Sequence, residues 1–199
     1  MANTNSPFGF KHLGFAQGGA AATFGLRRVK IKADYGTALY AGDVLQDLGT
    51  GYCGVWSNAD GGNTVGVVRS FKYLSTSTGR KIWSTYLPTT DHAYDIEALV
   101  IPIFGAPPQM FLVQAYATAF TIAEIGNKVQ PTTGTGTSIG GRGKSGMTVT
   151  AGSATTNTYP FRVVDLYSNI AAKGDNGTDD TSSYNIVVVQ STPYEALGV

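Results

Sequence analysis

Short alternations of apolar and polar residues recur along most of the chain. Arg28-Val29-Lys30-Ile31-Lys32 alternates with a period of two, which is typical of a β-strand with one buried face. The same pattern, or a short run rich in Val, Ile, Tyr and Phe, predicts strands at residues 38–45, 64–73, 81–87, 98–104, 110–117, 147–151, 160–167 and 184–190. Turn-forming residues such as Asp60-Gly61-Gly62-Asn63 separate these segments.

Helical periodicity is nearly absent. Residues 120–130 come nearest and are predicted to hold one short turn of helix. Strands at this spacing predict an all-β fold, a single β-sandwich or barrel of jelly-roll type over residues 26–199.

Residues 1–25 differ from the rest because Gly, Ala and Asn are interrupted by Phe8, Phe10, Phe15 and Phe24. Exposing several phenylalanines to water is unfavourable. We therefore expect an extended N-terminal arm whose rings dock on the chain's own domain or on a partner.

Charge is sparse and unevenly placed. Charged residues make up 14% of the chain and the formal net charge is +1, so the total charge provides no general attraction to nucleic acid or anionic membranes. No acid precedes Asp34 and no base follows Lys173. A basic start and an acidic end suit head-to-tail or acidic-partner contacts, and they also suit two solvated faces.

Three features bear on the compartment. Cys53 is the only cysteine, which excludes an intrachain disulfide and favours a reducing origin, with Cys53 as a small core residue. The N-terminus lacks the basic and apolar regions of a signal peptide. The uncharged stretch 98–123 is interrupted by Pro102, Pro107 and Pro108, which predicts two buried strands around a turn and a soluble protein with no membrane partner.

The glycine-rich stretch Gly134–Gly146 resembles a nucleotide-binding loop at first sight. A P-loop requires glycine five residues before Gly143-Lys144-Ser145, but Ser138 occupies that position. A β-branched stretch, Met147-Thr148-Val149-Thr150, follows where a helix is required. We predict a mobile hairpin loop, without nucleotide binding.

The sequence also lacks the residue patterns of a hydrolase triad, a zinc site and a calcium loop. His12 lies in the expected arm and His92 in a polar connection, and no Gly-x-Ser-x-Gly elbow supplies a nucleophile. Two histidines and one cysteine cannot form the usual zinc set, and the oxygen-rich residues 174–180 do not match a calcium loop. We predict no catalytic residue, no cofactor and no metal.

Arg69-Ser70-Phe71-Lys72-Tyr73 interleaves bases and aromatics, as single-stranded nucleic-acid sites do. A strand with Val68, Ser70 and Lys72 on one face and Arg69, Phe71 and Tyr73 on the other explains it better, and no nucleic-acid partner is expected.

Two segments carry a resemblance to a known group. Met1-Ala2-Asn3-Thr4-Asn5-Ser6-Pro7-Phe8-Gly9-Phe10 and Thr37-Ala38-Leu39-Tyr40-Ala41-Gly42-Asp43-Val44-Leu45 resemble the start of tailed-bacteriophage head decoration, or cement, proteins. The match covers roughly the first 45 positions.

The resemblance implies a non-enzymatic virion protein on the outer capsid surface, made in the host bacterial cytoplasm. It would bridge subunits of the major capsid protein and form dimers or trimers on capsid symmetry axes. Aromatic and basic residues in or beside the arm are the predicted capsid contacts, namely Phe8, Phe10, Lys11, Phe15, Arg27 and Arg28.

Two alternatives stay open. One is a phage tail or fibre component that binds a host glycan through Trp56 and Trp83. The other is a small glycan hydrolase whose paired carboxylates the sequence does not identify.

Overall fold

The computed structural model describes residues 2–15, 25–57, 63–103, 107–140, 142–151, 159–167 and 175–192. Strands dominate these residues, and neighbouring strands pair antiparallel, which confirms the predicted all-β fold. The elements are β1 (Lys11–Phe15), β2 (Arg27–Ile31), β3 (Leu39–Tyr40), β4 (Val44–Asp47), β5 (Cys53–Val55), β6 (Thr64–Leu74), β7 (Lys81–Ser84), β8 (Tyr86–Leu87), β9 (Ile96–Pro102), β10 (Gln109–Gln114), the 3-10 turn η2 (Ile122–Glu124), β11 (Lys128–Thr132), β12 (Thr137–Ile139), β13 (Arg142–Lys144), β14 (Thr148–Ala151), β15 (Phe161–Leu166) and β16 (Ile186–Ser191).

The first sheet has the strand order β1-β10-β16-β15-β11-β14. It curls so far that its last strand returns to the residues that follow β10, where Tyr116 N–H donates to the carbonyl of Val149 at 2.8 Å. The inward side chains of this curled sheet include Phe111, Phe161 and Val163, all fully buried.

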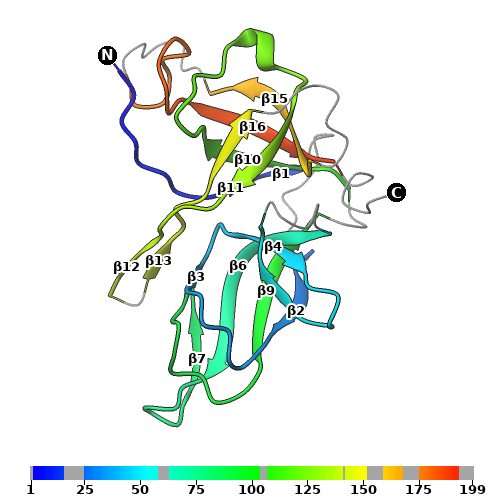
Figure 1. The fold of residues 1–199 in the computed structure, drawn as a ribbon, viewed down its shortest axis with the longest axis vertical. Coiled ribbons are helices and arrows are strands. Elements are labelled where there is room, and N and C mark those ends of the chain that lie inside the picture. Colours follow the sequence, from blue (N-terminus) through cyan, green and yellow to red (C-terminus); the bar gives the residue numbers. More distant parts are fainter. Residues whose placement is uncertain are drawn as a thin grey trace.

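The second sheet has the order β2-β9-β6-β4-β5, and β7 pairs with the far half of the long strand β6. Figure 1 shows it below the first sheet. The short β3–β8 pair covers one side, where Leu39 and Leu87 are fully buried in a second apolar cluster with Phe71.

Neighbouring residues on three strands of the second sheet join the two clusters. Successive side chains of a strand point to opposite faces. Adjacent residues therefore pack in different clusters. Val44, Val67 and Ile101 belong to the first cluster, and their neighbours Leu45, Val68 and Val100 belong to the second.

The N-terminal segment is part of this architecture. Residues 2–10 form no strand and run along the first sheet, and Lys11–Phe15 then pairs with β10 (Figure 1). Phe10 is 3% exposed, stacks on Phe161 with centroids 4.7 Å apart, and meets Phe111 edge-on at 6.1 Å. The arm expected over 1–25 thus contains a strand, and the Phe10 ring docks on its own chain.

Several local predictions are settled by the strands. The short helical turn expected within 120–130 is confirmed as η2, and Cys53 is buried as expected. The predicted faces of β6 hold from Ser70 to Tyr73 but are wrong for Val68 and Arg69, because the register shifts between Val68 and Ser70. Arg69 lies in this bulge and is exposed, whereas Val68 and Phe71 are both buried.

The uncharged stretch 98–123 contributes the end of β9 and all of β10. Among the described residues, no helix has the length and apolar character needed to cross a bilayer.

We expect Phe10→Ala to lower the free energy of unfolding by about 3–5 kcal/mol, because it removes a buried ring from between two others. Phe8→Ala is the matched control: this ring is only half-buried, and its loss should cost about 1 kcal/mol or less. Urea unfolding measures both. Equal losses for the two variants would show that Phe10 is not a core residue.

Candidate functional site

Three segments far apart in the sequence meet beside the two apolar clusters. They contain Gly9 and Phe10, Gly42 and Asp43, and Ser145, and we call this meeting point the junction. Phe10 N–H donates to the carbonyl of Gly42 at 2.9 Å. A side chain at Gly9 would place its Cβ 2.4 Å from the Cβ of Ser145, and Gly9 has a φ of +73°. Only glycine allows this close approach without displacing a neighbour.

Asp43 lies buried at the centre of the junction. Its carboxylate accepts hydrogen bonds from the Ser145 hydroxyl and from Tyr40 N–H, the latter at 2.7 Å. Burial raises the pKa of Asp43 to about 6, and the hydrogen bond from Ser145 partly opposes this.

The Ser145 hydroxyl extends the network to a third segment. Its oxygen accepts from Met147 N–H at 3.0 Å, and the Met147 sulfur accepts from Val44 N–H at 3.1 Å. The residues after the glycine-rich stretch are therefore tied to the start of β4.

Asn3 fastens the N-terminal segment to the loop before β16. Its amide nitrogen donates to the carbonyls of Asp179, Ser182 and Ser183 at 2.8–3.3 Å, and its amide oxygen accepts from Gly177 N–H at 2.8 Å. The carbonyl of Asp179, in the segment considered for calcium, is therefore occupied by an amide N–H of Asn3.

Gln114 provides the next anchor along the same segment. The side chain is fully buried, accepts from Ser6 N–H at 3.0 Å, and donates to the carbonyls of Thr4 and Tyr184 at 3.0 and 2.9 Å. Residues 3–10 are therefore held by polar contacts at one end and by Phe10 at the other.

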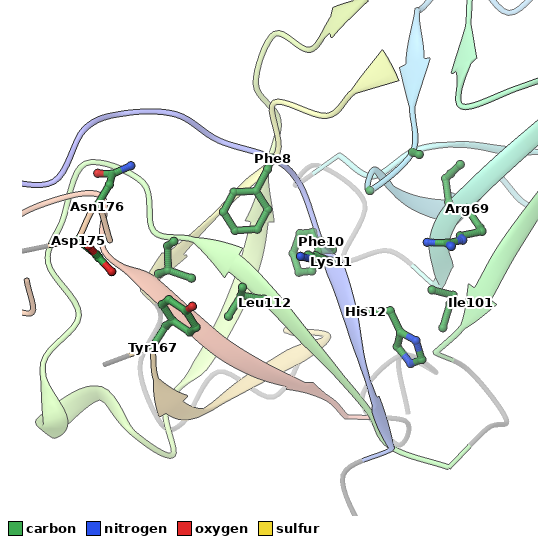
Figure 2. A pocket seen from close by; sticks show the side chains of 14 residues that line it. Phe8, Phe10, Lys11, His12, Arg69, Ile101, Leu112, Tyr167, Asp175 and Asn176 are labelled. Carbon is green, nitrogen blue, oxygen red and sulfur yellow. The ribbon is translucent and has the colours of Figure 1, made fainter. Parts of the chain in front are cut away.

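An open groove of about 630 Å³ lies along this segment, between the two sheets. Figure 2 shows Arg69 at one end, Asp175 and Asn176 at the other, and Leu112 and Tyr167 between them. Lys11 and His12 lie toward the Arg69 end. We call the part of the groove formed by Lys11, His12 and Arg69 the basic end.

The basic end carries uncompensated charge. In the described part of the chain, no carboxylate lies within ion-pair distance of Lys11 or Arg69. Arg69 occupies the bulge of β6, and the opposite wall has a second bulge in β1, between His12 and Gly14. Bulges redirect side chains and are frequent beside binding sites.

The six predicted capsid-contact residues lie in three different hollows of the surface. Phe8, Phe10 and Lys11 line this groove, although Phe10 faces the core. Phe15 lies in a small pocket beside Leu26.

Arg27 and Arg28 line a second groove of about 610 Å³ along β2, together with Asp47, Asp95 and Glu97. The Arg28 guanidinium lies 3.7 Å from the Glu97 carboxylate, with most of the arginine exposed. Sequence reasoning missed Asp43, Arg69, Ser145 and Tyr167 as site residues.

The Gly134–Gly146 stretch forms the β12–β13 hairpin, which Figure 1 shows reaching down beside β3. Gly143 N–H donates to the Thr85 hydroxyl at 3.0 Å, and a Cβ at Gly136 would lie 2.4 Å from the Tyr40 ring. These glycines allow close packing on the β3–β8 pair. The predicted hairpin is confirmed, and its mobility stays a prediction.

The histidine and tryptophan residues considered for catalysis and glycan binding lie in the following surroundings. His12 forms a 2.8 Å hydrogen bond with Gln109. Trp56 is 4% exposed and cannot serve as a glycan platform, whereas Trp83 is 59% exposed with the Lys72 ammonium 5.0 Å from its ring. Within the described ranges, no group of three His, Cys, Asp or Glu side chains could hold a metal ion.

Comparison with protein-family models, with curated protein sequences and with solved structures gave no match.

The raised pKa of Asp43 predicts a specific dependence of stability on pH. A group whose folded pKa exceeds its unfolded value stabilises the fold at low pH, and this contribution is lost as pH rises through the folded pKa. Between the ordinary 3.8 and about 6, the loss amounts to about 3 kcal/mol. Asp43→Asn abolishes this titration, so between pH 4 and pH 7 its stability relative to the native chain should improve by most of that amount, about 2.5 kcal/mol.

Ser145→Ala provides the directional control for this titration. Removing the hydroxyl that lowers the Asp43 pKa should move the loss of stability to higher pH. Urea unfolding of all three proteins across this range measures the effect. A stability difference between Asp43→Asn and the native chain that is constant from pH 4 to pH 7 would contradict the account.

Proposed function

We propose that this chain is a non-enzymatic virion protein that binds the outer surface of a phage capsid and bridges major capsid subunits. The observation that carries the proposal is the contact between the two segments that resemble decoration proteins. Residues 1–10 and 37–45 meet where Phe10 N–H donates to the carbonyl of Gly42 at 2.9 Å. Their resemblance therefore concerns one structural unit of the fold.

The architecture suits a mechanical role. Alternating residues of β4, β6 and β9 tie both apolar clusters to one sheet, and the N-terminal segment is fastened through Asn3 and Gln114. A body with these ties transmits force between its contacts with little internal yielding. Many copies on a symmetric shell then turn a modest contact into stable attachment.

The capsid-facing surface in this proposal is the exposed edge of β2. Arg27, Arg28 and Lys30 are all exposed there, and the half-buried Phe15 and the exposed Leu26 lie in the pocket at its start. An apolar anchor beside exposed cations fits a partner surface with an apolar pocket and an acidic rim. Three of the predicted contacts, Phe15, Arg27 and Arg28, belong to this surface.

Reversing charge on β2 tests the proposal. We expect Arg27→Glu/Arg28→Glu to weaken binding to undecorated capsid shells about tenfold or more, because attraction becomes repulsion at the contact. Co-sedimentation with purified shells, over a range of protein concentrations, measures the affinity.

The matched control is Arg80→Glu/Lys81→Glu, which makes the same change in net charge at two exposed residues where the β6–β7 turn meets β7. It should bind as the native chain does. Native protein that fails to bind shells would overturn the proposed function, whereas equal weakening in both variants would overturn the assignment of the surface. Deleting residues 2–20 is a poorer test because it removes β1 and Phe10 from the fold.

A further inference from the structure

We propose that the groove beside the N-terminal segment, with the cleft that adjoins it, is a two-fold self-association surface for a second copy of this chain. The cleft has a volume of about 260 Å³ and contains Ile122, Ile125, Asp165 and Asp180. Tyr167 and Ile186 line both the groove and the cleft. The two hollows are therefore neighbours on one continuous surface.

Charge changes sign along this surface. Lys11, His12 and Arg69 form its basic end. Asp175 lies at the other end of the groove (Figure 2), and Asp165 and Asp180 continue the acidic character into the cleft. Asp165, Asp175 and Asp180 are exposed, and we call them the acidic end.

The middle of the surface is apolar. Tyr167 is 44% exposed, Leu112 and Ile186 are half-buried, and Ile122 at the cleft is 73% exposed. Covering these side chains removes apolar area from water. An apolar centre between charged ends is the usual composition of a protein contact with a polar rim.

Symmetry connects these observations. A two-fold interface brings each patch of one copy against the corresponding patch across the axis. With the axis near Tyr167 and Ile186, the basic end of each copy faces the acidic end of the other, and the Tyr167 rings meet near the centre. Of the dimer and trimer that the sequence left open, this surface fits the dimer.

A second copy fits better than a partner of one charge. An acidic peptide or nucleic acid drawn to Lys11 and Arg69 would meet repulsion at Asp165 and Asp180. A partner that fits has an acidic region opposite the basic end, a basic region opposite the acidic end, and an apolar centre between them. A second copy of this surface, rotated by half a turn, has that arrangement.

The test measures association without any capsid present, so its outcome is independent of the proposed function. The acidic variant is Lys11→Glu/Arg69→Glu, and the basic variant is Asp165→Lys/Asp180→Lys. Sedimentation velocity at low ionic strength should show a dimer for the native chain and at least a tenfold higher dissociation constant for each variant alone. Circular dichroism and thermal unfolding confirm that both variants fold.

Mixing the two variants is the decisive arm. One contact then pairs the acidic groove end of the first variant with the basic cleft of the second, and the other contact pairs the unchanged acidic and basic ends. Opposite charges face each other at both contacts, so a heterodimer should form with near-native affinity. Arg80→Glu/Lys81→Glu, away from the surface, should remain a dimer. A native chain that stays monomeric at 0.1 mM or above, variants that dimerise alone as the native chain does, or a mixture that fails to associate would each overturn the inference.

Discussion

The close approach of the Gly9 and Gly42 backbones to each other and to the Ser145 side chain is the constraint on which the rest of the structure depends. It is made possible by two glycines with positive φ and by the buried carboxylate of Asp43, which accepts a hydrogen bond from each side. Desolvating a carboxylate is costly unless hydrogen bonds compensate it. The N–H of Tyr40 and the hydroxyl of Ser145 supply that compensation.

From this junction the path of the N-terminal segment is determined in both directions. Downstream, Phe10 enters the first core and β1 adds a strand to β10. Upstream, Gln114 and Asn3 hold the backbone against the loop before β16. Residues of this segment line the groove and supply Lys11 and His12 to its basic end.

Much of the fold was predictable from periodicity, because strands with one buried face alternate over several residues, as Arg28 to Lys32 do. Three strands escaped prediction for identifiable reasons. β1 contains Gly14, β5 contains Gly54, and β11 contains Pro131, residues that the β pattern disfavours. Their pairing partners decide the conformation instead.

The site was less predictable because it depends on contacts across long separations. Phe8 and Phe10 occupy one short motif, and only the rings of Phe111 and Phe161 distinguish the buried residue from the half-buried one. Arg69 reaches the groove through a bulge that the alternation of β6 does not reveal. The glycines around Lys144 suggested phosphate binding when the sequence was read alone. In the structure they allow close packing against the Tyr40 ring and the Tyr86 side chain.

Hydrogen exchange at the Phe10 amide tests the central claim most directly, that the N-terminal segment is an integral part of the fold. This N–H donates to Gly42 at the junction. We predict that it exchanges as slowly as the amides in the middle of β10, since both open only with the core. Exchange at the rate of an unstructured peptide, with β10 still protected, would contradict the account.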